Sequence, residues 1–335
     1  MKSARNLSME CAKLVAACFV VFLHVPFPGE LGGLISCLSR FAVPMFFAIS
    51  GYFSYQANTQ KLAKRLRHIL MLEAAAIGAQ IVWKGYLASY SGDTLWSYLR
   101  ETLSGGSVLI KWFLLNVDPF SGHLWYLSAM VSCYAVLWFL VRFHETSYRP
   151  LYILSSVFLV IFFCLSEFSP LFGIHVDYIF YRNAWFFGLP MFAMGLFLRE
   201  YQTCLSRSSG RLLLWMLSGV ALSFWEWRIL GGWEMYLGTV LFTAALLLLL
   251  AKHPLQNGPG FLRMFGSLST LIYLFHLIIL DYYNNFHLWQ RMQQWGEQEG
   301  WIRPLLILGV SLFTAILLVC VQECFSFLRN RIQTR

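Results

Sequence analysis

Apolar runs of about 20 residues recur from one end of this 335-residue chain to the other, and they limit the possible folds more than any other feature. A helix needs about 20 such residues to cross the hydrocarbon core of a bilayer. Hydrophobic residues make up 58% of the sequence and charged residues only 12%, which excludes an ordinary soluble domain. The sequence therefore predicts an all-α integral membrane protein.

Gly, Pro and charged residues interrupt the apolar runs, and the pattern predicts about ten transmembrane helices. The predicted spans lie near residues 9–27, 33–54, 69–90, 123–142, 150–167, 183–199, 211–227, 234–251, 267–284 and 304–326. With the N-terminus inside, most of the 25 Lys and Arg residues fall in the inner segments. Because cytoplasmic loops carry the excess of these residues, both termini are predicted to be cytoplasmic.

The net charge of +9 has the same explanation, because the basic residues are dispersed between apolar runs. A nucleic-acid-binding protein would gather them on one polar surface. We therefore expect membrane lipid as a partner, and no nucleic acid. The eight cysteines include no C-x-x-C motif, and we expect no metal site.

The longest predicted outer segment, residues 91–122, combines glycines with two tryptophans. It is either an interfacial or re-entrant segment that contacts an extracytoplasmic acceptor, or a plain connector whose aromatic residues lie at the headgroup level.

Ionisable side chains inside the predicted spans each cost on the order of 3 kcal/mol on insertion scales, so they should face the bundle interior or a wet cavity. Lys13 and His24 are eleven residues apart in the first span, which places them on one helix face, about 16 Å apart along the axis. An imidazole can take the proton from the attacking hydroxyl in acyl transfer. The alternative is a packing histidine bonded to a backbone carbonyl.

Arg40 in the second span lies four residues before Pro44, which is predicted to kink the helix. A permanent cation beside a break suits a phosphate or a developing oxyanion. The alternative pairs Arg40 with a carboxylate such as Glu30.

Ser269, Tyr273 and His276 in the ninth span are spaced by four and three residues. This spacing places a hydroxyl, a phenol and an imidazole on one stripe of an apolar helix, which should face a cavity. We expect these side chains, His24 and the buried cations to converge on one water-filled chamber.

Two further polar segments are weaker indications of a binding site. His123 and Trp125 open the fourth span at the outer surface, where interfacial aromatic residues are ordinary, and Arg182 and Asn183 precede the sixth.

The predicted inner loop at residues 61–68 carries more basic residues than orientation requires. It binds either the phosphates of a nucleotide-bearing acyl donor or anionic lipid headgroups.

The same residues make the chain resemble the acyltransferase-3 family of bacterial membrane O-acyltransferases, over essentially its whole length as a single membrane domain, residues 1–335. Six motifs occur in the family's order. They are Glu10, Lys13 and His24; Arg40, Val43, Pro44, Phe46, Phe47, Ser50, Gly51 and Tyr52; Lys64 and Arg67; His123, Leu124 and Trp125; Gly188, Leu189, Pro190 and Gly195; and Ser269, Tyr273 and His276. The membrane half of vancomycin-type serine racemases is related to this family.

The resemblance implies an enzyme of the bacterial plasma membrane that moves an acyl group, commonly acetyl from acetyl-CoA, to a hydroxyl of a glycan, a lipid-linked sugar or a similar cell-envelope acceptor. Acyl-CoA would be a co-substrate, and no bound cofactor is expected. His24 would be the base or a transient acyl carrier, with Arg40, Lys13, His276 and Tyr273 as the other catalytic candidates.

The remaining matched positions would bind the two substrates. Lys64 and Arg67 would lie near the donor phosphates, although Lys64 stands where the family usually has arginine, which alone contacts phosphate through two parallel hydrogen bonds. The acceptor-binding candidates are Glu10, Ser50, Tyr52, His123, Trp125, Arg182, Asn183 and Ser269.

A second class of function fits some of the same features. Broken helices with buried charges also line the substrate pathways of membrane transporters and exporters. Two matching halves with corresponding broken helices would favour a carrier of a small polar solute or glycolipid, and no internal repeat is visible in the sequence.

Overall fold

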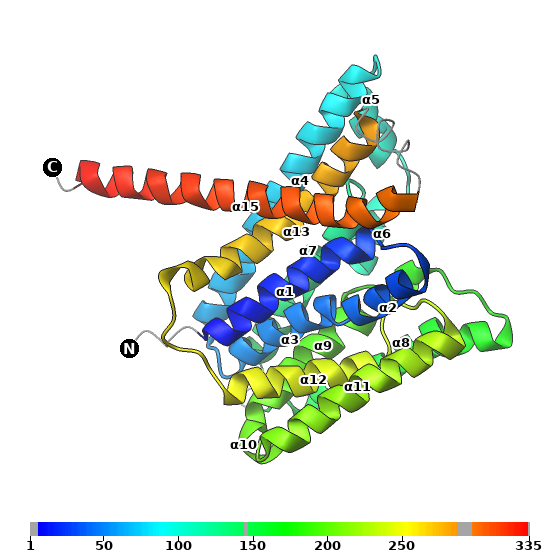
Figure 1. Cartoon of the computed structure of the whole chain (residues 1–335), viewed down its shortest axis with the longest axis vertical. Helices are drawn as coiled ribbons and strands as arrows, with labels where there is room; N and C mark the ends of the chain where they lie inside the picture. The colour runs from blue at the N-terminus through cyan, green and yellow to red at the C-terminus, as the bar shows by residue number, and fades with distance from the viewer. Residues whose placement is uncertain (1–5, 144–146, 287–296, 334–335) are drawn as a thin grey trace. The chain divides into compact units, whose positions relative to one another are not determined.

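The computed structural model describes residues 6–143, 147–286 and 297–333, and this part of the chain consists of helices and connecting turns without a strand (Figure 1). The chain divides into two compact units. Unit 1 contains residues 1–46 and 208–335, and unit 2 contains residues 47–207. The all-α prediction is confirmed.

Unit 1 brings together helices from both ends of the sequence. They are α1 (Leu7–His24), α2 (Gly29–Ser39), α11 (Ser209–Leu230), α12 (Leu237–Lys252), α13 (Phe265–Asn285) and α15 (Glu297–Gln333), with a 3₁₀ turn at Gly260–Met264. Helix α3 (Ala42–Ser54) begins in unit 1 and continues into unit 2.

Unit 2 is continuous in sequence. Its helices are α4 (Thr59–Tyr90), α5 (Leu95–Leu103), α6 (Val108–Leu115), α7 (Trp125–Phe143), α8 (Arg149–Phe163), α9 (Leu189–Glu200) and α10 (Gln202–Leu205). Short 3₁₀ or π turns lie at Gly122–Leu124, Cys164–Phe168, Ser169–Phe172, Tyr178–Phe180 and Ala184–Gly188.

Each predicted span overlaps one or more helical segments. Seven helical segments among the described residues are long and apolar enough to cross a bilayer, namely Leu7–His24, Gly29–Ser54, Thr59–Tyr90, Gly122–Phe143, Arg149–Phe172, Gly260–Asn285 and Gly300–Phe325. The other three predicted spans fall on α9, α11 and α12, of which α12 is apolar but has 16 residues. The cytoplasmic location of the termini stays a prediction.

The second predicted span is two helices rather than one kinked helix. Helix α2 ends at Ser39 and α3 begins at Ala42, so the break lies at Arg40 and before Pro44. Pro44 is the third residue of α3, where its missing N–H costs little because the first-turn amides of a helix lack intrahelical partners. Pro44 therefore correctly indicated an interruption, but the break lies four residues before it, at Arg40.

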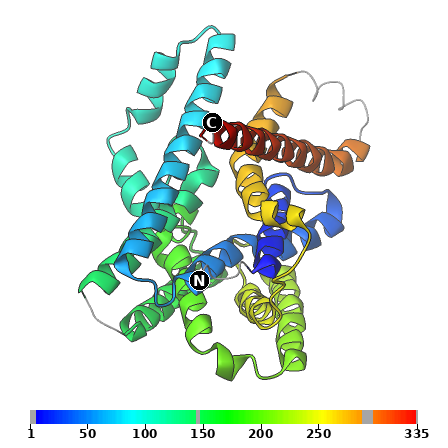
Figure 2. The ribbon, with the colours of Figure 1, turned by 90° about the vertical axis from the view of Figure 1, so that its left-hand side faces the viewer.

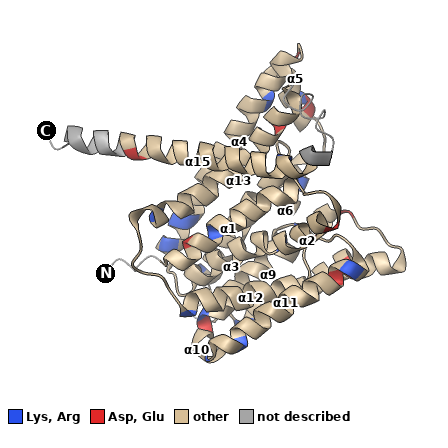
Figure 3. Cartoon of the chain, in the orientation of Figure 1, with Lys and Arg blue, Asp and Glu red and all other residues tan. Residues whose placement is uncertain are grey.

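The basic segment at residues 61–68 was predicted as a loop, and the structure shows it as the first turns of α4 (Figure 2). The Asn58 side chain caps this helix by accepting a hydrogen bond from the backbone N–H of Lys61 at 3.0 Å. Lysine and arginine are good helix formers, so a favourable cap extends the helix into the charged segment. Lys and Arg lie mainly near helix ends and connections (Figure 3).

The segment at residues 91–122 contains two short helices. Helix α5 begins with a capping box between Thr94 and Ser97. Helix α6 exposes large apolar side chains, including Ile110 at 60% and Phe113 at 70%. An exposed apolar helix beside an amphipathic one suits an interfacial segment, the first of the two interpretations.

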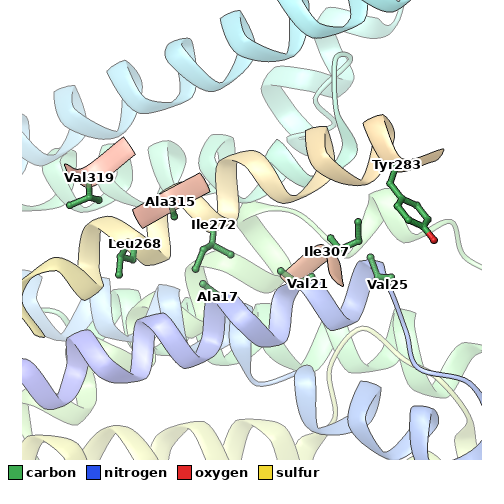
Figure 4. Packing of buried hydrophobic residues seen from close by; sticks show 9 residues of the cluster. All are labelled: Ala17, Val21, Val25, Leu268, Ile272, Tyr283, Ile307, Ala315 and Val319. Carbon is green, nitrogen blue, oxygen red and sulfur yellow. The ribbon is translucent and has the colours of Figure 1, made fainter. Parts of the chain in front are cut away.

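The core of unit 1 is formed by α1, α13 and α15 (Figure 4). Its buried residues are Ala17, Val21, Val25, Leu268, Ile272, Tyr283, Ile307, Ala315 and Val319. Figure 4 shows α1 and α13 running side by side in the same direction, with Ala17 near Ile272 and Val25 towards Tyr283. Since lipid tails are as apolar as these side chains, close van der Waals packing holds such helices together.

Close packing in unit 2 explains two glycines of the sequence motifs. A Cβ at Gly51 would collide with the backbone of Phe192, and a Cβ at Gly195 would collide with the backbone of Ala48. Helices α3 and α9 therefore approach backbone to backbone, an arrangement that small residues permit inside membranes.

We expect Gly195→Ala to destabilise the protein by about 1–3 kcal/mol, because the new methyl group must push two helix backbones apart. Gly78→Ala in α4 is the matched control, since a Cβ there meets nothing within 4 Å. Thermal unfolding in detergent should show a lower midpoint for the first variant and an unchanged or higher midpoint for the second. Equal midpoints for Gly195→Ala and the parent would contradict the packing argument.

Candidate active site

The structure brings together two histidines that lie far apart in the sequence. His24 is the last residue of α1 and is exposed, and His276 lies in α13 and is fully buried. Their ring centroids are 5.1 Å apart with an angle of 46° between the ring planes. The packing of Val21 and Val25 against α13 sets this approach, because these residues flank His24 on the contact face.

The hydrogen bonds of His276 fix its tautomer. Its Nδ1 lies 2.8 Å from the carbonyl oxygen of Tyr273 and 3.1 Å from that of Ile272. A carbonyl oxygen only accepts, so Nδ1 carries the proton and the neutral ring has its lone pair on Nε2. The backbone of α13 thus holds the imidazole in one orientation. A packing histidine bonded to a backbone carbonyl was the alternative interpretation of His24. His276 is the residue that fits this description.

The three residues of the stripe on α13 are all buried, and the cavity that they were expected to face stays a prediction. Ser269, Tyr273 and His276 are 3%, 7% and 0% exposed. The Tyr273 ring centroid lies 6.2 Å from that of His276, while the Ser269 hydroxyl donates to the carbonyl of Gly266 at 2.9 Å. Tyr273 therefore borders the histidine pair, and Ser269 bonds within its own helix.

The cations of the first two spans have carboxylate partners. The Lys13 Nζ lies 3.6 Å from Glu10 Oε1 on α1, and both residues belong to one motif. The Arg40 guanidinium at the α2–α3 break lies 3.4 Å from Glu234 Oε2. Glu30, which the sequence suggested for Arg40, pairs instead with Arg228. Arg40 is therefore paired with a carboxylate, as the alternative interpretation held, but the partner is Glu234 and not Glu30.

The Ser-Gly-Tyr motif of α3 has structural contacts in unit 2. The Tyr52 hydroxyl donates to Gln202 Oε1 at 2.6 Å and accepts from Arg199 Nη1 at 3.0 Å. The backbone carbonyl of Ser50 accepts a hydrogen bond from Ser54 Oγ at 2.7 Å. The contacts of Tyr52 join α3 to the end of α9 and the start of α10, and the Ser50 contact lies within α3.

His123 and Trp125 lie at the start of α7, as predicted, and both are buried. The Nδ1 of His123 is 2.8 Å from Ser121 Oγ. The guanidinium of Arg182 lies 4.2 Å from the ring centroid of Tyr178 and 5.7 Å from that of Trp125. The structure therefore brings Arg182 and Trp125 together.

Asn183 has a framework role. Its Oδ1 accepts from the backbone N–H groups of Trp185 and Phe186, and its Nδ2 donates to the carbonyls of Ile179 and Phe180. The side chain is fully buried and its amide is fully used at the start of a π turn.

Lys64 and Arg67 are exposed on one face of α4, three residues apart. Arg65 between them donates to the carbonyl of Phe53 at 2.9 Å and to Ser54 Oγ at 2.7 Å. The segment thus has one arginine with a structural role, while Lys61, Lys64 and Arg67 are exposed cations. Donor binding by Lys64 and Arg67 stays a prediction.

Sequence reasoning missed a polar cluster in unit 2. Asn116 is 2% exposed and joins three segments, because its Oδ1 accepts from Ala184 N at 2.8 Å and its Nδ2 lies 3.4 Å from Ser132 Oγ. Glu73 of α4 accepts a hydrogen bond from Ser128 of α7. The Ser128 partner lies 55 residues from Glu73 in the sequence, and no local pattern identifies it.

Asp118 follows α6 and is 5% exposed. Its Oδ1 accepts from the backbone N–H groups of Phe120 at 2.8 Å and Ser121 at 3.0 Å, while Oδ2 has no hydrogen-bond partner among the described residues. Burial raises the pKa of this carboxyl above its usual value, and the two N–H donors offset part of that effect.

We expect Asp118→Asn to be more stable than the parent at neutral pH. A raised pKa in the folded state means that folding favours the protonated carboxyl. The contribution of Asp118 to the free energy of unfolding is therefore present at low pH and is lost as the pH rises through the folded pKa. Asparagine keeps the accepting oxygen and cannot ionise. The difference in thermal midpoint should shrink as the pH falls towards 4, and a pH-independent difference would contradict this interpretation.

Among the described residues, no group of three or more His, Cys, Asp or Glu side chains could hold a metal ion. The cysteines of the described chain are not paired in disulfides. What the site offers chemically is an accessible imidazole, a buried imidazole of fixed tautomer and a phenol.

Comparison with known proteins agrees with the motifs. The family described as an acyltransferase domain matches residues 6–321. A protein of Enterococcus faecalis named amino-acid racemase is 25% identical over 211 residues, which cover 56% of this chain and 27% of that protein. The chain thus spans about a quarter of the length of this relative. No solved structure matches the chain.

Proposed function

The chain belongs to the acyltransferase-3 family and is a multi-pass membrane acyltransferase, and from this premise we propose that it transfers an acyl group, acetyl in the simplest case, from acyl-CoA to a hydroxyl of a cell-envelope glycan or lipid-linked sugar. We further propose that it acts in the bacterial plasma membrane. The observation that carries the catalytic part of the proposal is the histidine pair, His24 and His276.

His24 is the accessible member of the pair and is proposed as the group that meets the substrate. It lies at the C-terminal end of α1, where the helix carbonyls interact favourably with a cation. This position suits an imidazole that becomes an imidazolium during the reaction. His276, held through Nδ1, is proposed as a positioning residue that keeps the ring of His24 in place.

The reaction balances with these groups. The acceptor oxygen attacks the carbonyl carbon of the thioester, the C–S bond breaks, and CoA leaves as the thiolate. The hydroxyl proton passes to His24 and then to the thiolate or to water. The alternative route has the same balance, with an acyl group carried transiently on the imidazole of His24.

Lys64 and Arg67 are proposed to bind the donor phosphates. Both are exposed cations near the start of a long helix, and cations paired with phosphate give charge-assisted hydrogen bonds. Arg182 beside Trp125 is a proposed acceptor contact, because aromatic rings stack on the apolar faces of sugars and arginine donates to their hydroxyls.

The test is acyl transfer by the purified chain in proteoliposomes supplied with isotope-labelled acetyl-CoA and an envelope extract, with the product detected by mass spectrometry. Labelled ester on a glycan or lipid-linked sugar is the expected result. Movement of solute across the vesicle without donor and without acylated product would instead support the transporter hypothesis.

The two arginines of the motifs should differ in kinetic effect. If Arg40 stabilises charge in the transition state, Arg40→Ala should lower kcat by about tenfold or more, whereas Arg67→Ala should mainly raise KM for the donor. Steady-state kinetics with varied acyl-CoA measures both. Equal losses that appear only in donor KM would contradict a transition-state role for Arg40.

A further inference from the structure

We propose that unit 2 carries a binding site for one anionic phospholipid in a groove between α7 and α8. This site is separate from the residues assigned to acyl transfer, and the inference does not depend on the proposed function. The inference rests on two hollows that share Leu140, on the side chains that line them, and on Arg142 and Arg149.

The first hollow is apolar and has a volume of about 320 Å³. Helix α7 supplies a single face through residues spaced by three and four, and α8 supplies the opposite wall. The lining residues are Val136, Phe139, Leu140, Phe143, Pro150, Leu151 and Leu154. Both helices belong to segments that are long and apolar enough to cross the bilayer, so the hollow faces acyl chains.

The second hollow is smaller, about 240 Å³, and more polar. It shares Leu140 with the first and lies where α7 ends and α8 begins. Gln56, Asn58, Ser147 and Tyr148 contribute polar groups to its lining. Since the two hollows share Leu140, an apolar groove adjoins a more polar hollow near a helix end, which suits a phospholipid with an acyl chain in one part and the headgroup in the other.

The wall of the more polar hollow is preformed. Gln56 has a backbone φ of 54°, in the left-handed region that non-glycine residues seldom occupy. Its N–H donates to the Tyr148 hydroxyl at 3.1 Å, which ties the α3–α4 connection to the start of α8. The more polar hollow therefore does not have to form when the lipid binds.

Two exposed arginines adjoin the lining residues in sequence and favour an anionic ligand. The guanidinium of Arg142 lies 5.5 Å from the ring centroid of Phe143, which lines the apolar hollow. Arg149 lies in the sequence between Tyr148, which lines the polar hollow, and Pro150, which lines the apolar one. Basic pockets beside membrane-spanning helices bind anionic headgroups. The connection at residues 144–146 lies outside the described residues and is not part of the site.

Native mass spectrometry of the full chain in a mild detergent tests the proposal, with phosphatidylglycerol and phosphatidylcholine of the same acyl chains as probes. We expect one phosphatidylglycerol to be retained and phosphatidylcholine to be lost at the same collision energy. In Arg142→Gln/Arg149→Gln the affinity for phosphatidylglycerol should fall by about thirtyfold, because each basic residue near an anionic headgroup contributes about fivefold to affinity and the two contributions multiply. Arg100→Gln/Arg211→Gln removes the same charge from exposed positions elsewhere and should retain the lipid.

The apolar half is tested separately. Leu154→Trp fills the groove from a side chain that is 45% exposed, and Val157→Trp places the same group one turn further along α8, on a residue that does not line the groove. Only the first should lose the lipid, and both should keep the parent's thermal midpoint in lipid-free detergent. Equal retention of the two lipids, or equal retention by all variants, would overturn the proposal. Displacement of phosphatidylglycerol by a lipid-linked glycan, with loss of transfer in Leu154→Trp, would also overturn it by identifying the occupant as acceptor.

Discussion

His24→Ala should lower kcat for acyl transfer by about a hundredfold to ten-thousandfold, the usual contribution of a general base or an activated nucleophile. The imidazole of His24 is accessible and lies at the end of α1. Its ring lies beside that of His276. Removing it leaves the acceptor hydroxyl without a base. The donor KM should change little, because the proposed donor contacts lie on α4.

The measurement is single-turnover acyl transfer with labelled acetyl-CoA, which separates chemistry from product release. His175→Ala is the matched control, because this histidine is also exposed and lies outside the proposed site. It should retain the parent rate. Robust transfer by His24→Ala would remove the catalytic assignment while leaving family membership intact.

The helices could be predicted from the sequence because lipid leaves few alternatives. A chain in hydrocarbon must satisfy its backbone hydrogen bonds internally, so an apolar run of sufficient length becomes a helix. The boundaries were less certain where polar residues continue a helix beyond the apolar run. The basic residues 61–68 show this, since the cap at Asn58 starts α4 ten residues before the predicted span.

The candidate site was only partly predictable. The stripe of Ser269, Tyr273 and His276 follows from helical periodicity, and α13 confirms that the three residues are buried together. That His24 lies against His276 depends on the packing of α1 on α13 and could not be read from either helix alone. The pairing brings two of the expected side chains together, and the water-filled chamber itself stays a prediction.

The expectation that Arg40 converges with His24 on one water-filled chamber stays a prediction. The ion-pair partner of Arg40, Glu234, is 194 residues away in the sequence, while the nearer Glu30 is bound to Arg228. Local patterns identify a buried cation and leave its partner open, because partner choice is a property of tertiary packing. Asn116 illustrates the same limit, since a single asparagine in a loop gives no sequence signal for a residue that joins three segments.

His276 provides the second large effect. Its ring is fully buried, and Nδ1 is committed to two backbone carbonyls. We expect His276→Asn to lower kcat by about tenfold to a hundredfold, because the asparagine amide can replace the Nδ1–H donor but has nothing in the place of Nε2. His276→Phe preserves the ring shape without either nitrogen and should lose at least as much activity.

The pH dependence of kcat distinguishes positioning from packing. If His276 holds the ring of His24 in its reactive orientation, both variants should shift or flatten the pH profile of kcat relative to that of the parent, while their thermal midpoints stay close to the parent's. A role in packing alone would reduce the midpoint of His276→Asn, leave His276→Phe near the parent in activity, and keep one pH profile for all three proteins. That outcome would confine the catalytic assignment to His24.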